Sequence, residues 1–321
     1  MTSAARTGTS LAEIFAKYGL YVFFALLVIA ASFASPAFLS TKNIQNILTE
    51  GAPLGMVVIG QMFVIMVRGL DLSVASLMAT VAVIGTEFNA QSDGMIPVIF
   101  AACLAFSVLV GLTNGLLVTK RQVSPFLATL AMMIVLQGLR FAMTKGAPSG
   151  ALPEGFRTLG TGLLAGLPIN LLVLTLMAVV FGVRLHRTAF GRRVYMVGGS
   201  PRASELVGVN SDRVTILCYV ISSVCACLGG LFLVGYVGSV DNWVGQGYEL
   251  QSIAAAVMGG IALTGGRGTI GGALVGALIL IVLFNIVLLL GFPVEVQYIL
   301  QGIIIVVAAA FYTLAGRANR G

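Results

Sequence analysis

Long apolar runs follow one another along almost the whole chain, separated by short polar stretches. Because only helices and closed barrels satisfy every backbone hydrogen bond in lipid, and these runs are far longer than barrel strands, they predict membrane-spanning helices of about 20 residues. The predicted fold is an all-α, polytopic membrane helix bundle in one domain, residues 1–321. We expect about ten spans, at residues 20–38, 52–67, 72–90, 95–119, 124–143, 165–184, 214–237, 250–264, 270–291 and 294–314.

Composition excludes a water-soluble globule, since 58% of the residues are hydrophobic and only 9% are charged. The first apolar run follows Arg6 and Lys17, as the core of a signal peptide would. It is long, however, and lacks a clean cleavage site with small residues, so we expect a retained helix.

Basic residues indicate the orientation. An even number of spans places both termini on one side, and positive loops are retained in the cytoplasm. With both termini cytoplasmic, most of the 18 Lys and Arg residues lie inside, and only Lys42, Arg140, Lys145 and Arg157 lie outside. The net charge of +7 is therefore a topology signal, and we expect no nucleic-acid partner.

The chain shows no chemistry of its own. It contains no Gly-Lys pair, which a phosphate-binding P-loop requires, and the predicted spans contain almost no acidic residues for a proton relay. The four cysteines all fall within spans and His186 is the only histidine, so we expect no metal site, cofactor or catalytic residue. If the chain moves a solute uphill, the energy must enter through another polypeptide.

Residues 185–213 form a strongly basic stretch between two predicted spans. Within it, Ser200 can cap a helix that starts at Pro201 and runs to Val207, and Gly208 fits the left-handed position that ends such a helix. A helix of about two turns is unstable alone in water and must lean on something. One interpretation is a docking surface for a partner; the alternative is a solvated basic loop that only fixes topology.

Three segments in order resemble motifs of the ribose-type sugar permeases, the integral membrane subunits of bacterial ABC importers in the branched-chain and sugar permease superfamily. They are GLDLSVAS at 69–76, the stretch FGRRVYMVGGSP to LVGVN at 190–210, and GYELQSIAA to GGRGTIG at 247–271. The resemblance extends from about residue 40 to 310.

The resemblance implies a bundle of ten spans in the bacterial inner membrane, paired with a second permease subunit, a cytoplasmic ABC ATPase and a periplasmic solute-binding protein. It also implies that a helix in the 185–213 loop seats in a cleft of the ATPase. The residues implied in this coupling are Gly191, Gly199, Ser200, Pro201, Arg202, Ala203, Ser204, Glu205, Leu206 and Gly208.

Polar residues within or beside the spans have two interpretations. They can offer hydrogen bonds to a polyhydroxylated solute in the pathway, or they can join helices to one another. Asp71 in particular can contact the pathway, or it can cap the third helix and pair with Arg68. The candidates are Gln61, Asp71, Ser73, Asn114, Thr129, Gln137, Gln251 and Asn285.

The hypothesis from the sequence is a permease subunit that forms the pathway for a monosaccharide or a related small solute, without enzymatic activity, while a partner hydrolyses ATP. The alternative is a stand-alone secondary transporter or facilitator for a small neutral solute. Transport in vesicles by this chain alone would favour the alternative.

Overall fold

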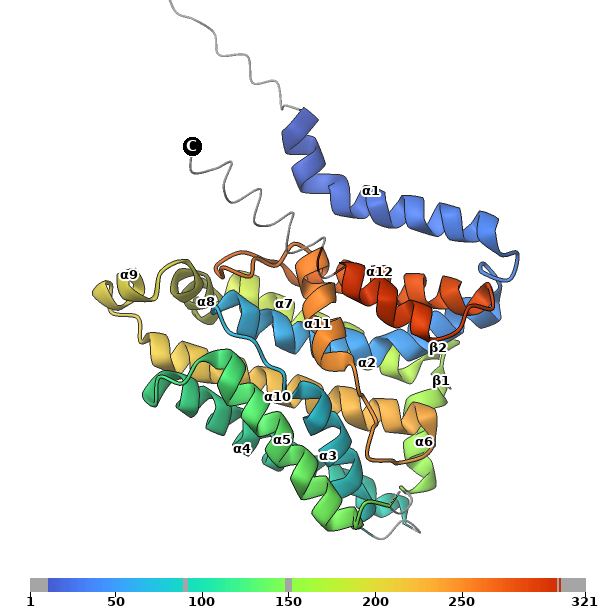
Figure 1. The fold of residues 1–321 in the computed structure, drawn as a ribbon, viewed down its shortest axis with the longest axis horizontal. Helices are drawn as coiled ribbons and strands as arrows, with labels where there is room; N and C mark the ends of the chain where they lie inside the picture. Colours follow the sequence, from blue (N-terminus) through green and yellow to red (C-terminus); the bar gives the residue numbers. More distant parts are fainter. Residues whose placement is uncertain (1–10, 89–91, 148–151, 305, 307–321) are drawn as a thin grey trace, which may run out of the picture.

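The computed structural model describes residues 11–88, 92–147, 152–304 and 306, and this part of the chain is almost entirely helical (Figure 1). Two short strands, β1 (Leu163–Leu164) and β2 (Leu167–Pro168), form an antiparallel hairpin, and η1 (Asp93–Met95) is a 3-10 turn. The α-helices are α1 (Leu11–Ala34), α2 (Thr41–Met66), α3 (Val74–Thr86), α4 (Ile96–Lys120), α5 (Pro125–Thr144), α6 (Glu154–Thr161), α7 (Ile169–Arg187), α8 (Ala189–Gly199), α9 (Pro201–Leu206), α10 (Ser211–Val237), α11 (Tyr248–Met258) and α12 (Ile270–Leu289).

The all-α membrane bundle is confirmed, and in the described residues six helices are long and apolar enough to cross a bilayer. These are α2, α4 with its η1 turn, α5, α7, α10 and α12. Of the last expected span, 294–314, residues 295–304 are helical, and most of the remainder lies outside the described residues.

Two of the expected spans are helices of about half the required length. Helix α3 has 13 residues and α11 has 11, so they are about 20 Å and about 17 Å long, whereas the hydrocarbon core is about 30 Å thick. The expectation of complete helices over 72–90 and 250–264 was therefore wrong. Each short helix follows a non-helical segment, residues 67–73 after α2 and residues 238–247 after α10, that folds back into the bundle.

Each half-length helix forms a unit with the long helix and the non-helical segment before it, and these two units run in opposite directions. Helices α2 and α10 pack antiparallel at the centre, since Pro53 and Val57 lie beside Gly229 while Gly60 lies beside Ser222. The unit α2, 67–73, α3 and the unit α10, 238–247, α11 therefore have the same order of parts in opposite orientation. Inverted pairs with discontinuous helices are typical of transporters, in which the broken helices surround the solute site.

Burial distinguishes the centre of the bundle from its lipid-facing surface. Helix α2 is almost completely buried, whereas α4, α5 and α7 expose most of their apolar surface. Glycine permits the closest approaches: a Cβ on Gly276 of α12 would lie 2.0 Å from the carbonyl oxygen of Ala255 in α11. Where lipid provides no hydrophobic drive between helices, such close packing holds them together.

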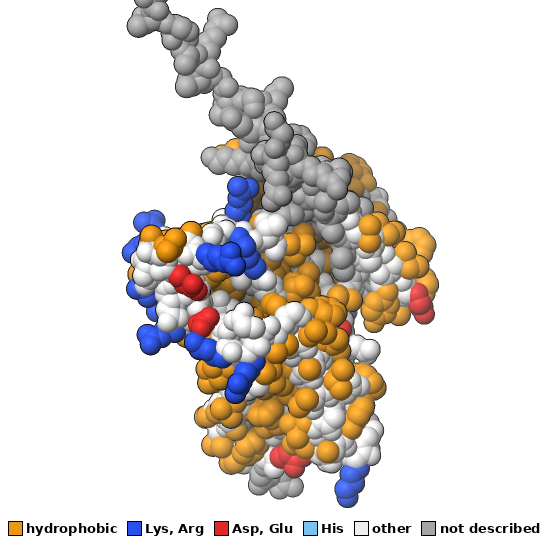
Figure 2. Space-filling view, turned by 60° about the vertical axis from the view of Figure 1, so that its left-hand side comes forward, with side chains coloured by type: hydrophobic (Ala, Val, Ile, Leu, Met, Phe, Trp, Pro, Cys, Tyr) orange, Lys and Arg blue, Asp and Glu red, His pale blue; other side chains and the backbone are white. Residues whose placement is uncertain are grey.

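One end of the bundle carries α8 and α9 together with the last residues of α4 and the first of α10. The Nζ of Lys120 in α4 lies 2.6 Å from a carboxylate oxygen of Asp212 in α10 at this end. Figure 2 shows Lys and Arg side chains gathered over the end with α8 and α9, beside broad hydrophobic sides. By the positive-inside rule we expect this end to face the cytoplasm, and α6 with the β1–β2 hairpin lies at the other end.

Candidate functional site

Helix α9 is the short helix that the sequence predicts in the basic loop. Ser200 is its N-cap and accepts a hydrogen bond from the Ala203 amide at 3.3 Å, and Pro201 occupies the first helical position. The helix ends at Leu206, one residue before the predicted Val207, and Gly208 has the expected left-handed φ of +81°. Local capping is therefore enough to define this helix.

One face of α9 is attached to the protein and the other is free. Ser204 is buried on this face, and the Ser211 hydroxyl at the start of α10 donates to the Pro201 carbonyl at 3.2 Å. On the opposite side, Leu206 is 89% exposed and Val207 is 71% exposed. Arg202, Ala203 and Glu205 are also exposed. The result is a fixed helix with an unpartnered apolar tip surrounded by charge.

Arg68, which follows the end of α2, joins α8 and α9 to the core. Its Nε donates to the Gly198 carbonyl at 2.7 Å, and its Nη2 donates to the Gly199 carbonyl. These are carbonyls at the end of α8, where a helix lacks internal donors and attracts positive charge. The predicted pair of Arg68 with Asp71 was wrong, because the guanidinium turns outward to α8 while the Asp71 carboxylate is buried.

Glycine packing and further hydrogen bonds complete this junction. A Cβ on Gly198 would lie 1.9 Å from the Met66 carbonyl oxygen, so only glycine allows α8 to approach α2. The Gly266 amide donates to the same Met66 oxygen at 2.9 Å, and the Tyr195 hydroxyl donates to the Gly268 carbonyl at 2.8 Å. Burial raises the pKa of Tyr195, which keeps it a neutral donor. The junction therefore connects α8 and α9 to α2 and to the loop between α11 and α12.

A buried polar network holds the returning segment 67–73. The Asp71 carboxylate accepts from the Ser73 amide at 3.0 Å, from the Ser73 hydroxyl at 2.5 Å and from the Ser222 hydroxyl at 2.9 Å. Asn114 donates to the Ser73 hydroxyl at 2.9 Å. With its amide nitrogen facing the Asp71 carbonyl, Gln61 donates to that oxygen and accepts from the Asp71 N–H, at 3.2 Å each.

This network shows what several of the predicted polar residues contact. Gln61, Asp71, Ser73 and Asn114 are fully buried against one another, and Thr129 of α5 donates to the Leu70 carbonyl at 3.3 Å. Asp71 is not the N-cap of α3, which is Ser73, but it fixes the turn before that helix. These residues join four helices to one segment, and a pathway role for them stays a prediction.

We predict that Asp71→Ala destabilises the protein strongly. The substitution leaves the Ser73 and Ser222 donors buried without an acceptor, at a cost of about 1–3 kcal/mol for each such group. The expected result is a lower melting temperature of the detergent-purified protein, measured by size-exclusion after heating. The matched control is Asp212→Ala, which removes an exposed ion pair worth less than about 1 kcal/mol. Equal melting temperatures for the two variants would contradict the structural role of Asp71.

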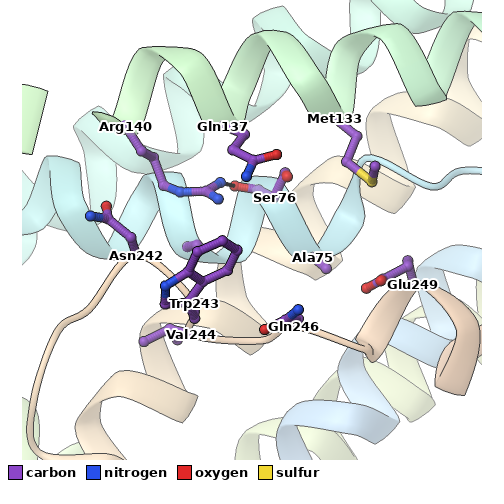
Figure 3. Close-up of a pocket in the computed structure, with 11 residues that line it drawn as sticks. Ala75, Ser76, Met133, Gln137, Arg140, Asn242, Trp243, Val244, Gln246 and Glu249 are labelled. Carbon is purple, nitrogen blue, oxygen red and sulfur yellow. Dashed lines mark hydrogen bonds between the residues drawn. The ribbon is translucent and has the colours of Figure 1, made fainter. Parts of the chain in front are cut away.

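A cavity of about 120 Å³ lies between the beginnings of the two half-length helices (Figure 3). The first two turns of α3 form one wall of the cavity and α5, from Met133 to Arg140, forms another. The segment before α11 and the first turn of α11 close it. Its lining residues are Ala75, Ser76, Ala79, Met133, Gln137, Arg140, Asn242, Trp243, Val244, Gln246 and Glu249.

Arg140 is the buried charge of this cavity. The sequence predicts it near the outer end of the span 124–143, on the outer side of the membrane, but it is only 3% exposed. Its Nη1 donates to the Ser76 carbonyl at 2.7 Å and to the Thr80 hydroxyl at 3.4 Å. Its Nε is buried and has no hydrogen-bond partner. Across the cavity, Glu249 accepts from the Gly247 amide at 3.0 Å. In the described part of the chain the single ion pair is Lys120 with Asp212, so Arg140 and Glu249 do not neutralise each other directly.

A second cavity lies on the other side of α11, between α2 and α12. It contains two of the predicted polar residues, Gln251 and Asn285, together with Glu50, Tyr248 and Gln297. Asn285 also exchanges two hydrogen bonds with Asn43, at 3.0 and 2.9 Å. Of the predicted pathway candidates, Gln137 lines the first cavity and these two line the second.

The sequence missed most of the first cavity. Trp243 and Gln246 lie in the returning segment, which an apolar run does not reveal, and Arg140 was assigned to a span end. A signal was present in the glycines on either side of Gln246, since Gly245 and Gly247 both have positive φ and mark an irregular turn. Among the described residues, no group of three His, Cys, Asp or Glu residues is arranged to hold a metal, and the four cysteines are buried and unpaired.

Comparison with known proteins places the chain among transport permeases. Residues 43–309 match the family described as branched-chain amino acid transport system / permease component. The chain is 37% identical over 295 residues to the ribose import permease protein RbsC of Bacillus subtilis, covering 91% of each chain. It is 36% identical to RbsC of Escherichia coli K12, covering 88% of this chain and 90% of the relative. It is 31% identical to the galactose/methyl galactoside import permease protein MglC of E. coli K12, covering 92% and 94%. No solved structure matches.

Proposed function

Because the chain belongs to the family described as branched-chain amino acid transport system / permease component, we propose that it is the permease subunit of a bacterial ATP-driven importer for a monosaccharide or a related polyhydroxylated solute. It forms the solute pathway as a single membrane domain over residues 1–321, with 185–213 as its cytoplasmic coupling loop. The importer resides in the bacterial inner membrane.

The choice of a sugar follows from the relatives. The family description names branched-chain amino acids, whereas the relatives above, over about nine tenths of their length, are named for the import of ribose and of galactose. Similarity that extends over the whole permease favours the sugar importers. It also favours a permease component over a stand-alone secondary transporter, the alternative from the sequence.

The observation that carries the proposed coupling is the exposed tip of α9. Leu206 and Val207 are adjacent apolar side chains, 89% and 71% exposed, at the cytoplasmic tip of α9, and burial in a partner's cleft would stabilise them. The bond from Ser211 to the Pro201 carbonyl holds α9 against the start of α10, so the helix is in place for docking. We infer that a cytoplasmic ABC ATPase provides the covering cleft and hydrolyses ATP. A second permease subunit and a periplasmic solute-binding protein complete the assembly, and no nucleic acid takes part.

The mechanism follows from the junction at Arg68. ATP binding draws the two docked α9 helices of the permease pair together. Because Arg68, Gly198 and Gly266 connect α8 to the end of α2 and to the loop between α11 and α12, the displacement reaches the segment before α3 and the loop after α11. It is thereby passed to the two half-length helices that surround the first cavity. Alternating access then results from movement of one inverted unit against the other.

Reconstitution tests this proposal. Vesicles containing this chain, its ATPase partner and its second permease, with the solute-binding protein outside, are expected to accumulate labelled ribose or galactose only with ATP inside. The chain without the ATPase is expected to accumulate neither sugar. Accumulation by the chain alone, driven by an ion gradient, would replace the proposal with a secondary transporter.

A further inference from the structure

We propose that the first cavity, between α3, α5 and the segment before α11, is a monosaccharide-binding subsite in which the ring of the solute packs on Trp243. This inference rests on the proposed function for the class of solute. Its evidence is independent of the coupling loop and lies in four features of the cavity.

The first feature is a fixed aromatic face. Trp243 is 53% exposed and its indole stands in the cavity between α5 and the backbone before α11 (Figure 3). Phe141 contacts it edge to face, with ring centroids 5.9 Å apart and planes at 71°. The Trp243 amide donates to Asp241 at 2.7 Å, and the neighbouring Asn242 donates to the Thr144 hydroxyl at 3.0 Å. The indole is therefore held in place before any ligand arrives, which lowers the entropic cost of binding.

The second feature is a set of polar groups without partners. In the described part of the chain, the side-chain amides of Gln137 and Gln246 make no hydrogen bond, although both line the cavity. The Arg140 Nε is buried in the same wall and is also without a partner. Of the three, only the Arg140 Nε is buried; Gln137 is partly buried and Gln246 is exposed to the opening of the cavity. A buried donor that makes no hydrogen bond costs free energy, and a costly ionisable group within a membrane bundle typically marks a solute pathway. A hydroxyl-bearing ligand would satisfy these groups.

The third feature is position. The cavity lies where the first turn of α3, with Ala75 and Ser76, meets the beginning of α11 at Glu249. Both inverted units therefore contribute the start of their broken helix to one site. A movement of either unit changes the distance between Ser76 and Glu249, so a ligand held between them would be released as the units separate.

The fourth feature selects the class of ligand. A monosaccharide has a face of C–H groups, which packs on an aromatic ring, and a rim of hydroxyls that both donate and accept hydrogen bonds. The cavity offers one aromatic face, two neutral amides, a carboxylate that accepts and a guanidinium that donates. The amides of Gln137 and Gln246 are neutral and can both donate to and accept from hydroxyl groups. The geometry thus favours a neutral polyol ring.

The experiment uses the fact that Trp243 is the only tryptophan of the chain. The purified full-length protein in phospholipid vesicles gives a fluorescence signal from this site alone. Titration with D-ribose or D-galactose is expected to protect Trp243 from acrylamide quenching in a saturable manner, with a fall of about twofold in the quenching constant. Gln246→Ala and Glu249→Gln are expected to raise the half-saturating sugar concentration about tenfold. The matched controls Gln45→Ala and Glu154→Gln, which lie outside the cavity, are expected to behave as the unchanged protein.

The outcomes are distinct. Protection by L-leucine but not by the sugars would overturn the ligand class, and absence of protection by any of them would overturn the subsite. If the sugars fail to protect Trp243 while ATP-driven uptake proceeds, the subsite is wrong and the proposed function stands. If they protect Trp243 but the reconstituted importer does not transport them, the proposed function fails and the binding site stands.

Discussion

Leu206→Asp is expected to abolish most ATP-driven uptake while the protein remains in the membrane at its normal level. Leu206 is 89% exposed at the tip of α9 and makes little contribution to the fold, so the substitution should not destabilise the chain. In a docked complex, however, full burial of a leucine side chain contributes about 1.5–3 kcal/mol, and an aspartate in an apolar cleft adds a desolvation cost. A loss of this size weakens docking by roughly tenfold to more than a hundredfold.

Three measurements distinguish loss of docking from misfolding. Uptake of labelled sugar, ATPase activity of the assembled importer and the amount of chain in the membrane are compared for Leu206→Asp, Leu206→Met and the unchanged protein. Leu206→Met keeps an apolar side chain of similar volume and is expected to retain uptake. Glu205→Lys, which reverses an exposed charge beside Leu206, is expected to show an intermediate defect. Normal uptake by Leu206→Asp would show that the tip of α9 is not the docking surface.

Local signals explain what the sequence could predict. Helix α9 was predictable because its boundaries depend on neighbours along the chain, with Ser200 as cap and Gly208 as stop. The complete spans were predictable for a similar reason, since length and apolarity are properties of one segment. Helix α2 begins earlier than expected, at Thr41, because Ser40 caps it and the helix tolerates Pro53 inside a packed bundle.

Long-range contacts explain which features the sequence could not predict. The segments 67–73 and 238–247 return into the bundle because distant groups receive them: Ser222 and Asn114 bind the first, and Thr144 binds Asn242 in the second. Nothing in an apolar run distinguishes a half-length helix followed by a turn from a complete span. The burial of Arg140 could not be predicted for the same reason, since its partner Ser76 lies 64 residues away. The first cavity depends on these contacts, and it could not be predicted without them.

Arg68→Gln is expected to separate ATP hydrolysis from transport. The variant loses the two charge-assisted bonds to the Gly198 and Gly199 carbonyls, while Leu206 and the rest of the docking surface stay unchanged. Hydrogen bonds to charged groups contribute about 1.5–3 kcal/mol, less where solvent competes, as at this exposed side chain. The ATPase should still dock, but movement of α9 would reach α2 less completely, and the number of solute molecules taken up per ATP should fall severalfold to about tenfold.

The control for Arg68→Gln is Arg121→Gln, the same change at an exposed residue that follows α4 at the same end of the bundle. It removes one positive charge from the cytoplasmic surface but no junction contact, so transport per ATP should not change. Arg68→Lys, which keeps the charge but lacks the fork that reaches two carbonyls, should lie between Arg68→Gln and the unchanged protein. If Arg68→Gln instead lowered uptake and ATP hydrolysis in equal proportion, Arg68 would affect assembly of the complex. The connection from α9 through Gly198 to α2 would then not transmit the movement of α9.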